Sequence, residues 1–209
     1  MKSKRSLVFV LATLSLLMLL AFSGLVRAQD ATPNPNGTGD MSNMDMSDTP
    51  ISPEVAQLIS QVRQGTADFR NFDGIKDKGY GKLLDCFTNK DIGGMGQHYV
   101  NGDLAGDDAV DPMKPEALVY EPTEDGKMNL VAFEYLVFAS VWDPKNTGRK
   151  PPVLFDRPFH LMTNIPNTPP VWALHIWLWT SNPNGVFADF NPLVFCPPDQ
   201  PITDMTPKS

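Results

Sequence analysis

The spacing of apolar residues changes near residue 80, from a helical period to a strand-like one. Before that point, aliphatic residues recur three or four positions apart, which is typical of one buried helix face: Val55, Leu58, Ile59 and Val62. Ser52 is a good helix N-cap and Pro53 suits the first helical position, so we expect order to begin near Ile51. Gly65 interrupts or ends this predicted helix.

A second helical piece is predicted over residues 66–78, where Phe69 and Phe72 lie three positions apart. The sequence Gly79-Tyr80-Gly81 ends it. The helical segments carry an apolar stripe, which must be buried against later parts of the chain.

From Leu83 onward, short apolar segments alternate with Pro, Gly, Asn and Asp, which is typical of strands and turns. The strand-like segments are GGMGQHYV at 93–100, EALVYEP at 116–122, MNLVAFEYLVF at 128–138 and VWALHIWLW at 171–179. EDG at 124–126 stands between two of them and predicts a hairpin. NPNG at 182–185 predicts another turn. Residues 143–170, with seven prolines, predict an irregular surface loop.

These elements predict an α+β fold, in which N-terminal helices pack on a mostly antiparallel sheet that curls towards a barrel. A cupin-like jelly roll is the alternative, favoured by His and Glu on strands and weakened by the lack of an HxH pair. We expect residues 51–198 to form this single globular domain and residues 199–209 to be a loose C-terminal tail.

The first 28 residues have the pattern of a secretory signal peptide. A basic start precedes a continuous apolar run, and Val26-Arg27-Ala28 fits a cleavage site. An uncleaved anchor is the alternative, because the apolar run is about long enough to span a bilayer. We therefore expect a secreted or extracytoplasmic protein of the cell envelope, with no membrane insertion after the signal is cleaved.

Residues 29–50 predict a disordered linker, because they lack large apolar clusters and are rich in Pro, Asn, Gly, Ser and Asp. Met41, Met44 and Met46 are interleaved with aspartates in this segment. Thioethers are soft ligands for Cu(I), so the three methionines are weak copper candidates. A flexible acidic tether is the alternative interpretation.

The charge of the mature chain argues against nucleic-acid binding. Removing residues 1–28 takes away four of the 17 basic residues and none of the 24 acidic ones, which leaves a net charge of −11. Such a surface repels phosphate backbones and attracts cations or basic partners.

Two cysteines occur, Cys86 and Cys196, and both follow the predicted signal peptide. In an oxidising compartment one disulfide between them is the expected state. It would join the start of the main domain to its end. A pair of metal thiolates is the alternative, but no CxxC spacing supports it.

Three polar residues stand on otherwise apolar predicted strands: His98, Glu134 and His175. Glu134 is the only charged residue between Leu130 and Phe138, and a buried carboxylate must be paired, bound to a metal or protonated. Strand periodicity puts Trp177 and Trp179 on the same face as His175, where they would limit the access of water.

If their strands are neighbours, His98, Glu134 and His175 form one polar pocket, and three interpretations of it stay open. The group is structural, with the carboxylate paired to an imidazole. It is a transition-metal site of the His-His-carboxylate type, open on one side. It performs metal-free acid–base chemistry. His160, in the proline-rich loop, is the weakest of the histidine candidates.

No GxSxG or HExxH signature is present, so the sequence does not decide whether the protein is an enzyme. The favoured function is a secreted ligand- or metal-binding domain whose His/Glu pocket takes a metal ion or a small molecule. One alternative is an enzyme that uses the pocket for acid–base or metal-assisted chemistry. The other is a structural or interaction protein of the cell envelope.

Three segments, GGMGQHYVN, PEALVYEP…GKMNLVAFEY and LHIWLWTSNPNGVFADFNPLVFC, resemble a group of uncharacterised secreted bacterial proteins. Members of that group have an MGxHYVN-like segment, a YEP segment before a hairpin and a C-terminal LHxWLWxxNPxGxFxxxNPxxxC segment. The resemblance covers about residues 65–196 and implies a common fold. It implies no activity, and no residue role comes from it.

Overall fold

A computed structural model of the chain describes residues 50–165 and 167–198. The predicted signal peptide, nearly all of the predicted linker and the predicted C-terminal tail lie outside the described residues. So do the copper candidates Met41, Met44 and Met46, and these expectations stay predictions. Within the described part of the chain, no helix is both long enough and apolar enough to cross a membrane.

Helix α1 (Pro53–Gly65) begins where the sequence predicts and is held at both ends by hydrogen bonds. The Ser52 hydroxyl accepts a hydrogen bond from the Val55 amide at 3.2 Å, and proline is the first helical residue. At the other end the Thr66 amide donates to the Val62 carbonyl at 3.0 Å. Val55 and Val62 are buried, so the predicted apolar stripe faces the core.

The predicted second helical piece over 66–78 is a chain of short 3-10 helices rather than an α-helix. They are η3 (Ala67–Arg70), η4 (Phe72–Gly74) and η5 (Lys76–Lys78). Their tight turns hold two aromatic rings against the sheet. The Phe69 ring meets Phe133 edge-on at a centroid distance of 5.8 Å, and the Phe72 ring meets Tyr120 at 5.0 Å.

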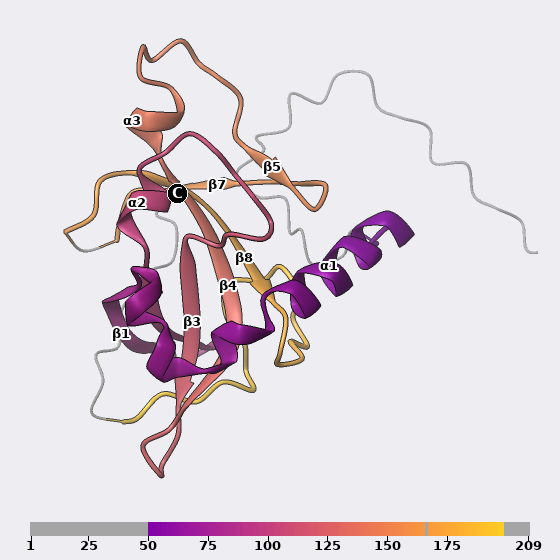
Figure 1. The fold of residues 1–209 in the computed structure, drawn as a ribbon, viewed down its shortest axis with the longest axis vertical. Coiled ribbons are helices and arrows are strands. Elements are labelled where there is room, and N and C mark those ends of the chain that lie inside the picture. Colours follow the sequence, from indigo (N-terminus) through magenta and orange to yellow (C-terminus); the bar gives the residue numbers. More distant parts are fainter. Residues whose placement is uncertain (1–49, 166, 199–209) are drawn as a thin grey trace, which may run out of the picture. The chain divides into compact units, whose positions relative to one another are not determined.

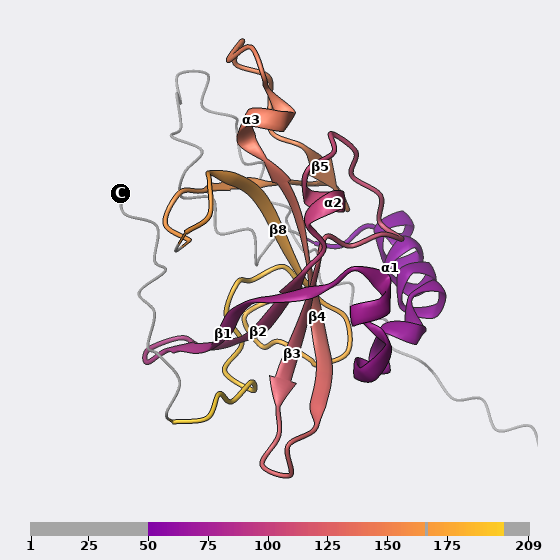
Figure 2. The same ribbon diagram turned by 60° about the vertical axis from the view of Figure 1, so that its left-hand side comes forward.

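Six strands form one sheet in which every neighbouring pair is antiparallel, in the order β1-β2-β3-β4-β8-β7. These strands are β1 (Gly81–Asn89), β2 (Gly93–Val100), β3 (Ala117–Pro122), β4 (Met128–Phe138), β7 (His160–Met162) and β8 (Val171–Trp177). Short helices follow two of them, α2 (Gly102–Ala105) after β2 and α3 (Ala139–Trp142) after β4 (Figure 1). The sheet twists and curls into a half-barrel, which confirms the α+β prediction (Figure 2).

The jelly-roll alternative is wrong. A jelly roll packs two large sheets against each other. Within the described residues, the second sheet is only the two-stranded ribbon of β5 (Val153–Leu154) and β6 (Arg157–Pro158).

The two faces of the six-stranded sheet are covered differently. Figure 2 shows α1 and the 3-10 helices together on one side of the sheet. The core on that side contains large side chains of β3, β4 and β8, among them Tyr120, Phe133 and Ile176. The opposite face carries the residues of the other parity, and there the core combines small residues such as Ala117 and Ala173 with larger ones such as Phe87 and Phe190.

The predicted β3–β4 hairpin is confirmed, with the Gly126 amide donating to the Thr123 carbonyl at 2.9 Å. Four strands go beyond the prediction. β1 has three register shifts against β2, which hide its alternation. β5, β6 and β7 have only two or three residues each and lie in the stretch 143–170, which the prolines predict to be an irregular loop. That prediction is wrong at these residues.

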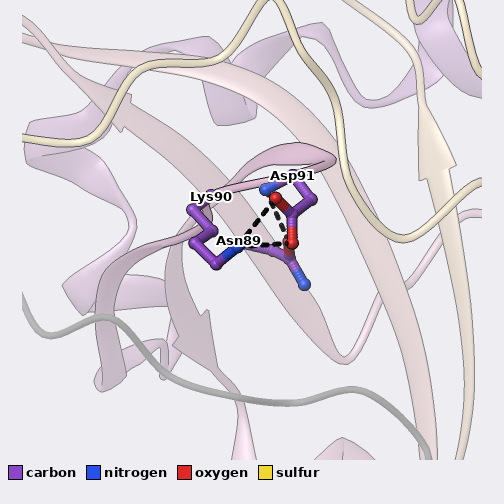
Figure 3. Close-up of polar contacts among 3 residues, drawn as sticks. All are labelled: Asn89, Lys90 and Asp91. Carbon is purple, nitrogen blue, oxygen red and sulfur yellow. Dashed lines mark hydrogen bonds and ion pairs between the residues drawn. The ribbon is translucent and has the colours of Figure 1, made fainter.

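The predicted disulfide is confirmed: Cys86 in β1 is bonded to Cys196, with Cα atoms 5.4 Å apart. At the turn between β1 and β2, Lys90 donates to both carboxylate oxygens of Asp91 at 2.9 Å, and the Asp91 amide donates to the Asn89 side chain at 3.0 Å (Figure 3). The predicted turn at 182–185 also forms, with the Gly185 amide donating to the Asn182 carbonyl at 3.0 Å.

Gly94 tests how closely the C-terminal segment packs on β2. A Cβ atom there would lie 2.4 Å from the Val194 carbonyl oxygen, a backbone atom, whereas a Cβ atom at Gly81 would have no neighbour within 4 Å. We expect Gly94→Ala to lower the free energy of unfolding by about 1–3 kcal/mol through overpacking. Gly81→Ala, the matched control, should leave it unchanged or slightly raised. Chemical denaturation measures both, and equal effects would contradict the close approach.

A buried His-Glu-His site

Strand register places Glu134 and His175 beside each other and leaves His98 one strand further away. Glu134 on β4 is the direct partner of His175 on β8. On its other side, Glu134 pairs with Ala117 of β3, while His98 of β2 pairs with Val119 of the same strand. The small Ala117 side chain leaves room above β3, across which His98 and Glu134 meet.

The three predicted residues lie together, as expected if their strands are near one another. His98 Nε2 is 3.5 Å from Glu134 Oε2. One possible ligand atom from each of His98, Glu134 and His175 lies within 4.8 Å of the other two. The exposed fractions of these residues are 1%, 8% and 1%, so the whole group is buried.

Aromatic rings cover the two imidazoles. Trp177 stacks on His175, with ring centroids 4.7 Å apart and planes 20° apart, and its indole N–H donates to the Ala188 carbonyl. Phe87 stacks on His98 at 5.8 Å. Stacking fixes the ring planes and shields one face of each imidazole from water. Trp177 therefore has the position that the alternation predicts.

Trp179 does not. Its ring packs edge-on against Phe133 at 4.7 Å, in the core on the helix-covered side of the sheet. β8 ends at Trp177, so the strict alternation of faces that placed Trp179 beside His175 no longer applies two residues later. The prediction that Trp179 lines the site is wrong.

Burial sets the charge state of the site when no ion is bound. It lowers the pKa of His98 to about 4, although the nearby Gly96 carbonyl opposes the shift, and it lowers the pKa of His175 well below the usual value. Burial raises the pKa of Glu134 to about 8, with a further contribution from the charge of Asp189. Near pH 7, two neutral imidazoles therefore face a protonated carboxyl group.

The ring nitrogens of His175 are buried without a hydrogen-bond partner among the described residues, whereas His98 has the Gly96 carbonyl nearby and its Nε2 lies 3.5 Å from Glu134 Oε2. Buried polar groups are normally paired, and leaving one unpaired costs roughly 1–3 kcal/mol. This lack of pairing distinguishes the group from a well-satisfied structural His–Glu pair.

Two further residues lie near the site. The sequence ranks His160 as the weakest histidine candidate and does not point to Asp189. His160 lies on β7 opposite Ala173, so all three histidines of the chain lie on the same face of the sheet. Its Nε2 is 3.8 Å from a carboxylate oxygen of Asp189, and both side chains are about one third exposed. No sequence signal marks Asp189, which lies in an irregular segment after β8.

A cavity of about 390 Å³ reaches the site. His98 and Glu134 line it, and His175 does not. Its remaining buried or half-buried wall is mainly apolar: Leu84, Val100, Ala105, Leu136, Phe138, Ile165 and Val171. The site is thus closed by stacked rings on one side and bordered by an apolar cavity on the other.

Two neutral imidazoles and a carboxylate are suitable ligands for a transition-metal ion. Around a tetrahedral zinc ion, ligand atoms are about 2.0–2.2 Å from the metal and therefore about 3.4 Å apart. The present spacing of up to 4.8 Å would have to contract by about 1.4 Å for tetrahedral coordination of zinc.

Comparisons with protein-family models, with curated proteins and with solved structures find no match to this chain. Any function assigned to the chain therefore rests on the geometry of the site.

The pKa values predict how stability depends on pH when no metal is bound. Glu134 and Glu116 both have a pKa raised by burial from 4.5 to about 8. The folded state therefore keeps protons that the unfolded state has lost, and stability falls as pH rises. From about pH 6.5 to 8, each carboxyl should lower the free energy of unfolding by about 2 kcal/mol.

Glu134→Gln and Glu116→Gln form a matched pair for this test. Each substitution should remove about half of the decrease between pH 6.5 and 8, measured by denaturation in the presence of a chelator. Below pH 6.5 the decrease should be offset, because unfolding allows His98 and His175 to bind protons. A stability that rises from pH 6.5 to 8 would contradict the assignment.

Proposed function

We propose that this protein binds one transition-metal ion through His98, Glu134 and His175. The observation that carries the proposal is the convergence of three buried ligand atoms within 4.8 Å, with both His175 nitrogens unpaired among the described residues. A bound cation would be coordinated by one nitrogen of each imidazole ring. It would also replace the proton on Glu134 by a stronger interaction.

The cavity favours an open site over a closed structural one. Structural zinc sites have four protein ligands, whereas sites that act on a ligand keep a position free. Here the part of the chain that the structure describes supplies three ligands, and two of them line the cavity. We therefore favour a metal site that takes up a further ligand from the cavity. An enzymatic reaction at that position is the second candidate, supported by the same opening.

Two further expectations belong to the proposal. The Cys86–Cys196 disulfide and the signal-peptide pattern of residues 1–28 support an extracytoplasmic location. The three proposed ligands also lie in the three segments by which the chain resembles the group of secreted bacterial proteins. We propose that a metal site of this type is a property of that group.

Metal binding tests the function directly. The purified protein, stripped with a chelator, should bind one equivalent of Zn²⁺ or Co²⁺ in calorimetry and release protons as it does so. Glu134→Gln and His175→Ala should each weaken binding by at least about tenfold. His160→Ala and Glu116→Gln, which change a histidine and a buried carboxyl outside the ligand set, should keep it.

A second control separates this site from the methionines of the predicted linker. Replacing Met41, Met44 and Met46 together by leucine should leave Zn²⁺ and Co²⁺ binding unchanged. The proposal is overturned if no equivalent of either ion binds, or if Glu134→Gln binds as well as the original protein.

A further inference from the structure

The cavity beside the site has an apolar wall and one polar end. Its exposed lining residues, Gly81, Lys82, Leu83, Gly102 and Asn167, mark the mouth. The buried polar side chains that line it, His98 and Glu134, mark the inner end. A ligand that enters therefore passes apolar side chains before it reaches the polar group.

We infer that the cavity binds a small apolar monocarboxylate, whose carboxylate group coordinates the metal ion at the inner end while its apolar part contacts Leu136, Phe138 and Val171. The inference rests on the proposed metal site and names the ligand that occupies the open position.

The charge balance of the buried site selects an anion. A divalent ion and the Glu134 carboxylate together leave one positive charge at a place that is 8% exposed or less. A buried net charge is costly unless it is compensated. One monoanionic oxygen donor makes the inner end neutral and completes the coordination of the metal. The charge of Asp189 also reaches Glu134, but this side chain is one third exposed and lies 3.8 Å from His160 Nε2, so it compensates the buried charge only in part.

The apolar wall of the cavity favours a ligand whose part outside the carboxylate group is apolar. Lys82 at the mouth is paired with Asp85, so it presents no uncompensated charge to an entering molecule. Beyond the mouth, the side chains between the two ends are aliphatic or aromatic except for the half-buried Thr168, so most of the wall offers no hydrogen-bond partner to a polar or charged body.

The volume limits the size of the ligand. About 390 Å³ corresponds to roughly thirteen water molecules at about 30 Å³ each, so a molecule of about ten non-hydrogen atoms fits. An aromatic ring joined by a short chain to a carboxylate has this size.

The experiment uses the Co²⁺-loaded full chain and three probes: 3-phenylpropionate, its uncharged amide, and acetate. Coordination is read from the visible absorption of Co²⁺, and affinity from calorimetry. We expect 3-phenylpropionate to shift the Co²⁺ bands and to bind at least about tenfold more tightly than either the amide or acetate. The chelator-treated protein should not bind it measurably.

Two variants test the route through the cavity. Gly81 and Gly102 line the mouth, and a Cβ atom at either would meet nothing within 4 Å. Gly81→Leu and Gly102→Leu should therefore fold, keep Co²⁺ binding and weaken 3-phenylpropionate by about tenfold, with a smaller effect on acetate. Ala56→Leu, on the exposed side of α1, is the control and should change nothing.

Each outcome is decisive for a different part. Failure of Co²⁺ to bind overturns the metal site and this inference together. Co²⁺ loading without a spectral response to 3-phenylpropionate overturns only the inference. Three further outcomes also overturn the inference as stated. If the amide binds as tightly as 3-phenylpropionate, the site does not select an anion. If acetate does, the apolar wall has no role, and if affinity is unchanged in both leucine variants, the ligand does not enter through this cavity.

Discussion

The curvature of the sheet determines whether the site exists, because a whole strand separates His98 from Glu134. Neighbouring strands lie about 4.8 Å apart, so the backbones of β2 and β4 in a flat sheet would be roughly 10 Å apart, with their side chains parallel. In this sheet the tips of the two side chains approach to 3.5 Å. Ala117 on the intervening strand, three register shifts in β1 and the closely packed Gly94 of β2 all fit this bend. The cavity depends on the same bend, since its wall crosses β1, β2, β4 and β8.

The buried His98, Glu134 and His175 side chains destabilise the folded state unless their polar atoms bind a partner. An unpaired buried ring nitrogen costs roughly 1–3 kcal/mol, and the two nitrogens of His175 together are a substantial part of the 5–15 kcal/mol that stabilises an ordinary domain. The opposite face of the sheet instead buries large aromatic rings, and the Tyr120 hydroxyl there donates to the Phe69 carbonyl. The buried polar residues of the site destabilise the folded state, whereas the aromatic core on the other face stabilises it. A bound ligand explains this arrangement more easily than stability alone does.

Much of this arrangement could be predicted from the sequence, and the failures have identifiable causes. Parity within MNLVAFEYLVF and ALHIWLW put Glu134 and His175 on buried strands, and a period of two is reliable while a strand continues. It failed at Trp179, where the strand had ended. The closeness of His98 could only be assumed, because the pairing order and curl of the sheet are properties of the whole chain. The pair of His160 and Asp189 had no signal, since one residue is on a three-residue strand and the other in an irregular segment.

The asymmetry of the surroundings argues for a site that exchanges a ligand. Trp177 stacks on His175 and Phe87 on His98, so the rings are fixed and shielded on those sides. The cavity lies beside His98 and Glu134 and leaves His175 out. A group whose role was only to hold strands together would be enclosed on all sides by atoms that pair with it. Here the enclosed side supplies rigidity, and the side of His98 and Glu134 opens into an apolar space of suitable size for a small molecule. Rigid donors with one unfilled direction are what a metal ion needs in order to bind and still accept a further ligand.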